Sequence, residues 1–213
     1  KYKNAVVIGG GLLGLEAAWL WTYAAGDGVV FIAAGVLSGL SAAMLTALWG
    51  REDRRPAAAR LWQWWLVADG MLLLGFLGLA NAAVWSQQHL TTTLPSLSMT
   101  WETLAQVLPR TAMHNQSAAQ YWTTSAGWWL LPLVAAAAIR SGLPPFHSAA
   151  ISWWGQVSAP VGVMTVIGSL PWGLFVWMRI IEPTFSVDLR EQSAVLTGWG
   201  ALAVHAAERY GCR

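Results

Sequence analysis

The stretch VVFIAAGVLSGLSAAMLTALW, residues 29–49, runs for 21 residues without a charged side chain. An α-helix rises 1.5 Å per residue, so about 20 consecutive apolar residues cross the hydrocarbon core of a bilayer. The stretch is bounded by Gly28 and by Gly50, which precedes a strongly charged segment. It therefore predicts one transmembrane helix.

The composition of the whole chain supports a membrane protein. Of 213 residues, 56% are hydrophobic and 10% are charged, whereas a soluble domain carries about 25% charged residues. The net charge of +2 is small, and the basic residues stand in short segments between apolar ones. A nucleic-acid partner would call for a basic stripe instead. The lipid bilayer is the expected partner, and nucleic acid is excluded.

Further apolar stretches of similar character follow along the chain. Two polar segments, 51–60 and 86–127, separate some of them, and neither resembles a folded domain. The pattern predicts an all-α, polytopic membrane protein with about four to six transmembrane helices. The expected spans are 5–25 with Glu16 as its only charge, 61–85 with Asp69 as its only charge, 128–139 and its continuation past Arg140, 157–178, and a weaker one at 194–204.

Basic residues predict the orientation of these spans, because positively charged loops stay in the cytoplasm. If residues 5–25 cross the membrane, seven basic residues fall on the cytoplasmic side and three on the other. This split predicts a multi-pass protein of the inner (plasma) membrane of the cell. The seven are Lys1, Lys3, Arg51, Arg54, Arg55, Arg60 and Arg140, and the three are Arg110, Arg179 and Arg190. Tryptophans near the span ends, Trp65 among them, are expected to anchor at the lipid–water interface.

The segment IRSGLPPFHS, residues 139–148, predicts a broken membrane helix. Gly142, Pro144 and Pro145 interrupt the helix and free backbone carbonyls, which is tolerated only beside protein or a water-filled cavity. Arg140 and His147 flank the break, the first a fixed cation and the second able to exchange a proton near neutral pH. In the alternative interpretation, Arg140 snorkels to the interface and His147 lies in a loop.

Two segments carry a resemblance to a known family. IRSGLPPFHS, followed by SAPVGVMTVIGSLPWGLFVWMRI at residues 158–180, resembles the discontinuous helix and the next helix of antiporter-like, proton-translocating subunits of respiratory complex I and multisubunit cation/proton antiporters. The stretch WGREDRRPAAARLWQWWLVADGMLLLGFLGL, residues 49–79, is similar to the preceding helix pair. The resemblance covers roughly residues 29–182.

This resemblance implies that protons pass along buried lysines, histidines and a glutamate at mid-membrane. Arg140 takes the place of the lysine, His147 matches the histidine, and Asp69 matches the aspartate of a Gly-Asp pair whose order is reversed here. Arginine does not release its proton in a protein, and Ala34 and Gly35 stand where the glutamate is expected. Scaffolding and passive conduction therefore remain alternatives to pumping. The implied role is a partial, non-catalytic subunit of an NADH:quinone oxidoreductase-type complex that works with other membrane subunits.

A second resemblance lies at the beginning of the chain. AVVIGGGLLGLEAA, residues 5–18, resembles the nucleotide-binding turn of pyridine nucleotide-disulfide oxidoreductases. Its G-x-G-x-x-G consists of Gly9, Gly11 and Gly14, and Glu16 follows. As an alternative function, the chain is a fragment or fusion of an NAD(P)- or FAD-dependent oxidoreductase, with these four residues at the cofactor. The acid expected at the end of the next strand is Ala33.

The same sequence is also compatible with a membrane helix. Gly10, Gly14 and Ala18 recur every four residues, a spacing that allows close helix packing, and Glu16 then becomes an intramembrane carboxylate. Since membrane spans follow instead of further parallel strands, we expect no bound cofactor. His89 and His114 lie far apart without neighbouring cysteines, so no metal site is expected. The predicted regions are 1–28 for the fingerprint or first helix, 29–205 for the membrane domain and 206–213 for a tail.

Overall fold

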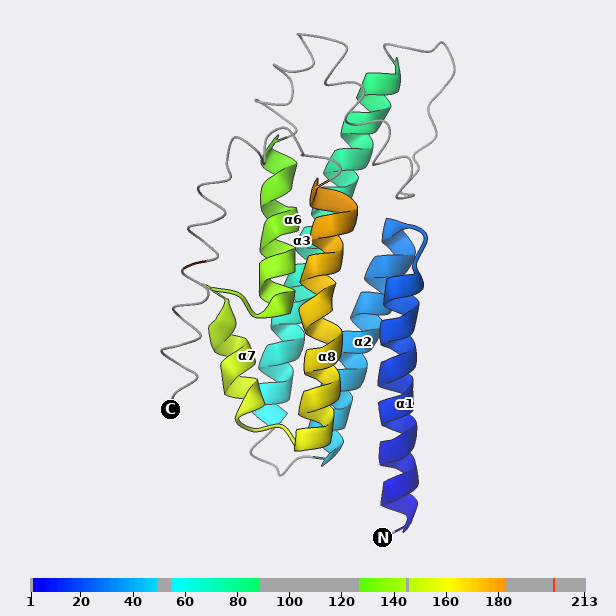
Figure 1. The fold of residues 1–213 in the computed structure, drawn as a ribbon, viewed down its shortest axis with the longest axis vertical. Helices are drawn as coiled ribbons and strands as arrows, with labels where there is room; N and C mark the ends of the chain where they lie inside the picture. Colours follow the sequence, from blue (N-terminus) through cyan, green and yellow to red (C-terminus); the bar gives the residue numbers. More distant parts are fainter. Residues whose placement is uncertain (1, 50–54, 89–126, 145, 183–200, 202–213) are drawn as a thin grey trace.

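A computed structural model of the protein describes residues 2–49, 55–88, 127–144, 146–182 and 201. The described part is helical, and no β-strand occurs in these ranges. Figure 1 shows the helices side by side in one elongated bundle. They are α1 (Tyr2–Ala24), α2 (Gly28–Trp49), α3 (Arg55–Gln88), α6 (Gly127–Ser141), α7 (His147–Trp154) and α8 (Ala159–Val176), which continues as the π-helical turn η3 (Trp177–Ile181).

Four of these helices are long and apolar enough to span a membrane. They cover Val6–Ala24, Gly28–Trp49, Arg55–Asn81 and Ala159–Ile181, while Trp128–Ser141 forms a shorter apolar helix. The prediction of an all-α, polytopic membrane protein is therefore confirmed. The expected weak span at 194–204, apart from residue 201, and most of the 86–127 segment lie outside the described residues.

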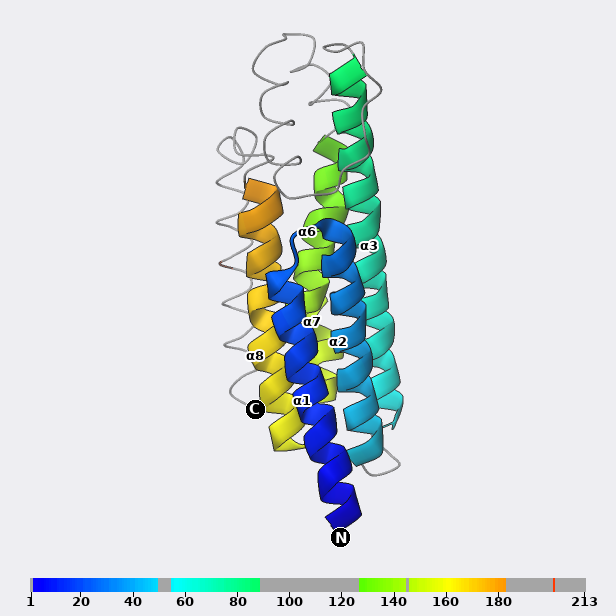
Figure 2. The same ribbon diagram turned by 90° about the vertical axis from the view of Figure 1, so that its right-hand side faces the viewer.

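The helices alternate in direction along the bundle. In the view of Figure 1, α1 runs up from the N-terminus and α2 runs down. α3 then runs up, α6 and α7 together run down, and α8 runs up. α3 packs against α2, α6 and α7, whereas α1 packs against α2 and α8. The view turned by 90° shows α1 on the outside of the bundle with α2 and α8 on either side of it (Figure 2).

Asp27 forms the turn that reverses the chain between α1 and α2. Its Oδ1 accepts a hydrogen bond of 2.8 Å from the backbone N–H of Val30, and its carbonyl accepts one of 3.1 Å from the N–H of Phe31. This is the N-cap arrangement, in which an aspartate oxygen satisfies a free N–H of the first helical turn. The cap fixes where α2 begins.

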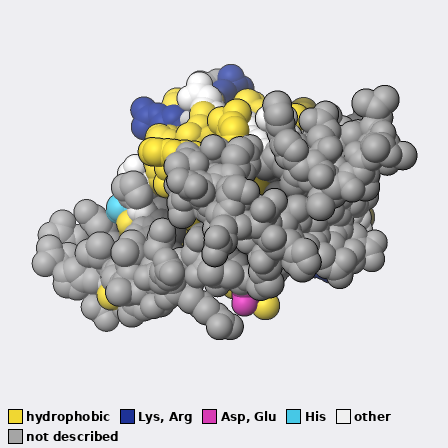
Figure 3. Space-filling view, turned by 90° about the horizontal axis from the view of Figure 1, so that it is seen from above, with side chains coloured by type: hydrophobic (Ala, Val, Ile, Leu, Met, Phe, Trp, Pro, Cys, Tyr) yellow, Lys and Arg dark blue, Asp and Glu magenta, His cyan; other side chains and the backbone are white. Residues whose placement is uncertain are grey.

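The outer surface of the bundle is apolar, as expected for contact with lipid. Leu13 and Leu20 of α1 and Ile167 and Leu174 of α8 are each at least 60% exposed. Soluble monomers rarely expose contiguous apolar surface on this scale. Figure 3 looks onto one end of the bundle, where hydrophobic side chains make up much of the described surface in view.

The oxidoreductase-like fingerprint lies inside an uninterrupted helix. Residues 2–24 form α1, and Ala33, which the oxidoreductase resemblance implies at the end of the next strand, lies within α2. A nucleotide-binding turn requires a strand followed by a tight turn and a helix, and the described residues contain no such unit at Gly9, Gly11 and Gly14. The expected packing stripe is only partly present: Ala18 is buried, but a Cβ added at Gly10 or Gly14 would meet nothing within 4 Å, and it is Gly11 that faces the side chain of Leu45 in α2.

The predicted break after Arg140 is present and has a defined geometry. Gly142 has a φ of +67°, the left-handed conformation that suits glycine. Its N–H donates to the carbonyl of Ile139 at 3.2 Å, and the N–H of Leu143 donates to the carbonyl of Ala138 at 2.8 Å. This pair of bonds is a Schellman motif. Two of the carbonyls that we expected the break to leave free are therefore satisfied by the chain itself.

Close approach between α1 and α8 depends on Gly168. A Cβ added there would overlap the indole of Trp19, whereas a Cβ at the exposed Gly70 of α3 would meet nothing. We expect Gly168→Ala to lower the free energy of unfolding in detergent by about 1–3 kcal/mol through overpacking. Gly70→Ala is the matched control and should be neutral or stabilising by up to about 1 kcal/mol. Equal effects of the two substitutions on denaturant unfolding would contradict this packing.

Candidate functional site

The candidate site consists of Asp69 and Arg140, which come from two adjacent helices. Asp69 lies on the buried face of α3 together with Trp65 and Leu72, so its carboxylate points into the bundle. Arg140 lies in the last turn of α6. Because α6 ends at the Gly142 motif, partway along the bundle (Figure 1), this last turn lies among the other helices. Both residues are buried, with exposures of 3% and 1%.

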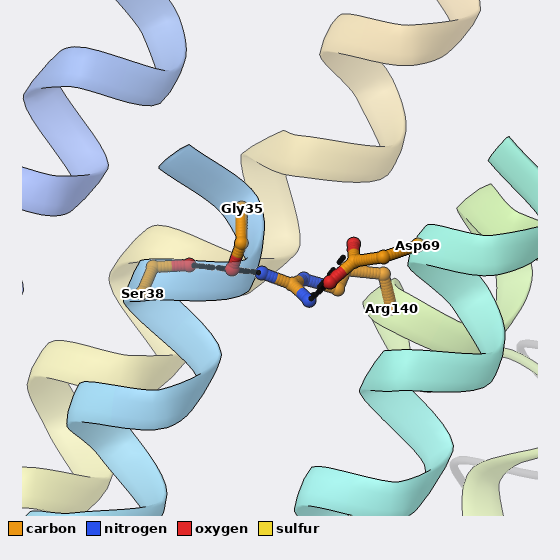
Figure 4. A network of polar contacts seen from close by, with 4 residues as sticks. All are labelled: Gly35, Ser38, Asp69 and Arg140. Atoms are coloured by element: carbon orange, nitrogen blue, oxygen red, sulfur yellow. Dashed lines mark hydrogen bonds and ion pairs between the residues drawn. The ribbon is translucent and has the colours of Figure 1, made fainter. Parts of the chain in front are cut away.

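The guanidinium of Arg140 binds three groups from α2 and α3. Nη1 donates to both carboxylate oxygens of Asp69, at 3.0 and 3.2 Å, and forms the ion pair. Nη2 donates to the carbonyl oxygen of Gly35 and, at 2.8 Å, to Oγ of Ser38. The Ser38 hydroxyl in turn donates to the Gly35 carbonyl at 2.7 Å. Figure 4 shows Arg140 between Asp69 on one side and Gly35 with Ser38 on the other.

Gly35 occupies a narrow position at this site. A Cβ there would lie 3.4 Å from Oδ1 of Asp69 and 3.6 Å from Nη2 of Arg140, so a side chain longer than a methyl group would enter the network. The resemblance implies a glutamate where Ala34 and Gly35 stand. The structure instead supplies an oxygen from the backbone of Gly35.

Three indoles surround the guanidinium. The ring centroids of Trp65, Trp172 and Trp19 lie 4.4, 5.2 and 5.8 Å from its Cζ. A desolvated cation over an aromatic face is stabilised by the ring quadrupole. The expectation that Trp65 anchors at the interface is therefore wrong, because its side chain is buried against Arg140. Its position four residues before Asp69, on the same face of one helix, was the sequence signal that could have placed it.

The burial of Arg140 decides between the two interpretations of this residue. A snorkelling arginine keeps its charged end in water, but Arg140 is 1% exposed and makes four hydrogen bonds inside the bundle. It therefore does not add to the positive charge of a cytoplasmic loop. The seven-to-three count that we used for the orientation becomes six to three.

The other predicted site residues are His147 and Glu16. His147 begins α7 beyond the break and is partly buried, but the hydrogen bonds described for Arg140 go to Asp69, Gly35 and Ser38. Glu16 is exposed on α1. The structure thus brings Asp69 and Arg140 together in one hydrogen-bond network and places Glu16 on the exposed face of α1.

Within the described ranges, no group of three or more His, Cys, Asp or Glu side chains could hold a metal ion. Comparison of the chain with protein-family models, with curated proteins and with solved structures finds no match. The fold and the site define a polytopic helical membrane protein with an ion pair buried in its bundle.

The ion pair predicts an unequal response to single and double substitutions. Asp69→Ala leaves the guanidinium buried without its counter-charge, so we expect the free energy of unfolding in detergent to fall by about 3–5 kcal/mol. The double variant Asp69→Leu with Arg140→Met replaces both charges by apolar groups and should recover most of this loss. Unfolding titrations with a denaturing detergent measure both effects.

Asp27→Ala provides a matched control, because it also removes an aspartate that accepts a hydrogen bond. Loss of this helix cap should cost about 1 kcal/mol. An Asp69→Ala effect no larger than that of Asp27→Ala would contradict a tightly coupled pair. So would a double variant that is less stable than Asp69→Leu or Arg140→Met alone.

Proposed function

We propose that the chain is a proton-conducting, antiporter-like membrane subunit of an NADH:quinone oxidoreductase-type complex. The observation that carries this proposal is the Arg140–Asp69 ion pair, which lies beside a helix break inside a bundle of membrane-length helices. Ionisable groups inside a membrane are expensive and mark ion or proton routes by default. The resemblance of residues 29–182 to antiporter-like subunits supports the same role.

The two members of the pair have different roles in this proposal. Asp69 is the member that takes up and releases a proton, because arginine keeps its charge in proteins. A proton on Asp69 removes the counter-charge of Arg140, while the carbonyl oxygen of the neutral carboxyl group, Gly35 and Ser38 can still accept hydrogen bonds from the guanidinium. An unpaired buried charge is costly. Proton uptake at Asp69 is thereby coupled to a rearrangement around Arg140.

His147 is the proposed relay on the other side of the break. It begins α7, seven residues after Arg140, and its imidazole can hold and release a proton. Arg140 sets the local electrostatic potential between the carboxylate and this imidazole. The oxidoreductase alternative gains no support from the described residues, because its fingerprint is helical.

Replacement of Asp69 tests the central step. In proteoliposomes that contain the chain with its co-purifying membrane subunits, a potassium diffusion potential should drive proton uptake measured by an enclosed pH-sensitive dye. Asp69→Asn keeps the shape of the side chain but cannot carry the proton, so we expect proton flux to fall at least about tenfold, the equivalent of about 1.4 kcal/mol. Glu16→Gln, the control on the exposed face of α1, should retain the parent flux.

The proposal is wrong if the parent protein conducts no more protons than empty vesicles. It is also wrong if Asp69→Asn conducts protons as well as the parent, when size-exclusion chromatography shows that both proteins are folded.

Substitutions at Arg140 and His147 separate the two remaining roles. Arg140→Lys restores the residue type expected from the resemblance and a cation that can lose its proton, so flux should be kept or raised. His147→Ala should lower flux severalfold without unfolding the protein, because it removes a proton-exchanging group outside the ion pair. Equal flux with His147→Ala and with the parent chain would remove the relay role and leave His147 a structural residue.

A further inference from the structure

A small cavity lies beside Arg140 between α3, α6, α7 and α8. Its walls include the side chains of Trp65, Trp153, Trp154 and Thr165. Trp153 is fully buried, whereas Trp154 is 43% exposed. The cavity therefore extends from the buried guanidinium toward the partly exposed face of α7.

Two buried polar atoms at this cavity have no hydrogen-bond partner among the described residues. They are Nε of Arg140 and Oγ1 of Thr165, and each residue is 1% exposed. A buried donor without an acceptor costs about 1–3 kcal/mol, and native proteins pair nearly all such groups. Since both residues line the same cavity, one occupant can serve both atoms.

The size and charge of the cavity select this occupant. There is room for about one water molecule. The charge of Arg140 is already balanced by Asp69 at 3.0 Å, so a small anion would leave an excess negative charge in the interior. We propose that the cavity binds a single water molecule, which accepts a hydrogen bond from Nε–H of Arg140 and shares a second one with the hydroxyl of Thr165.

This water site completes the hydrogen bonding of the guanidinium. Asp69, Gly35 and Ser38 bind Nη1 and Nη2, and the water binds the remaining N–H. It places an exchangeable polar molecule between Arg140 and the α7 side of the bundle. The assignment stands on the cavity and its donors and does not depend on proton conduction.

Hydroxyl-radical footprinting tests the site, because a short X-ray pulse creates radicals from water where it lies and oxidises the side chains in contact with it. Trp153 and Trp172 are both 0% exposed, but only Trp153 lines the cavity. In the parent protein in detergent, we expect Trp153 to be oxidised at least about fivefold faster than Trp172, as measured by mass spectrometry of peptides; this ratio equals about 1 kcal/mol. Protection of Trp153 to the level of Trp172 overturns the proposal.

Thr165→Val removes the hydroxyl but keeps the shape of the side chain, and should lower Trp153 oxidation severalfold. Ala150→Val, which narrows the same cavity from α7, should do likewise and serves as a second variant if the first does not fold. Ser41→Ala removes a hydroxyl from the exposed side of α2 and should change nothing. Unchanged Trp153 oxidation in folded Thr165→Val or Ala150→Val contradicts the site. If Trp153 oxidation in the parent protein rises when gluconate replaces chloride, an anion occupies the cavity. This result also overturns the proposal.

Discussion

A guanidinium that keeps its charge in the interior of the bundle requires compensation from the helices that pack against it. Arg140 receives a carboxylate from α3, a carbonyl and a hydroxyl from α2, and the faces of three indoles. A buried charge that loses its partner destabilises a protein by several kcal/mol. The positions of α2, α3 and α6 relative to one another are therefore coupled through this one side chain. Any change in the charge of Asp69 acts on the packing of all three helices.

The depth of Arg140 follows from local backbone chemistry. The left-handed Gly142 closes α6 through two carbonyl hydrogen bonds, so the chain turns before the helix has crossed the full length of the bundle. The last turn of a helix carries the negative end of the helix dipole, which favours a cation. Arg140 lies in this turn. The glycine thus both ends the helix and creates an electrostatic environment suited to the arginine.

The membrane spans could be predicted from length and charge alone, but the site could be predicted only in part. Residues 29–49 differ from the observed α2 by one residue, because its boundaries coincide with changes in polarity. α3 begins at Arg55 instead of 61, because helix formation tolerates the arginines that hydropathy excludes. Asp69 and Arg140 were identifiable by type. Their contact was not, since 71 residues separate them along the chain. The partner at Gly35 is a backbone oxygen, and the residue type does not predict that this oxygen binds Arg140.

The glycine-rich beginning of the chain shows how the solvent, water or hydrocarbon, decides between two conformations of the same sequence motif. In water, such a motif after an apolar strand forms a turn whose N–H groups face a phosphate. In hydrocarbon, every N–H must find a carbonyl within its own segment, which favours one continuous helix. α1 is such a helix. Gly11 there permits the close approach of Leu45. The absence of a side chain, which in a turn would make room for a phosphate, here makes room for a neighbouring helix.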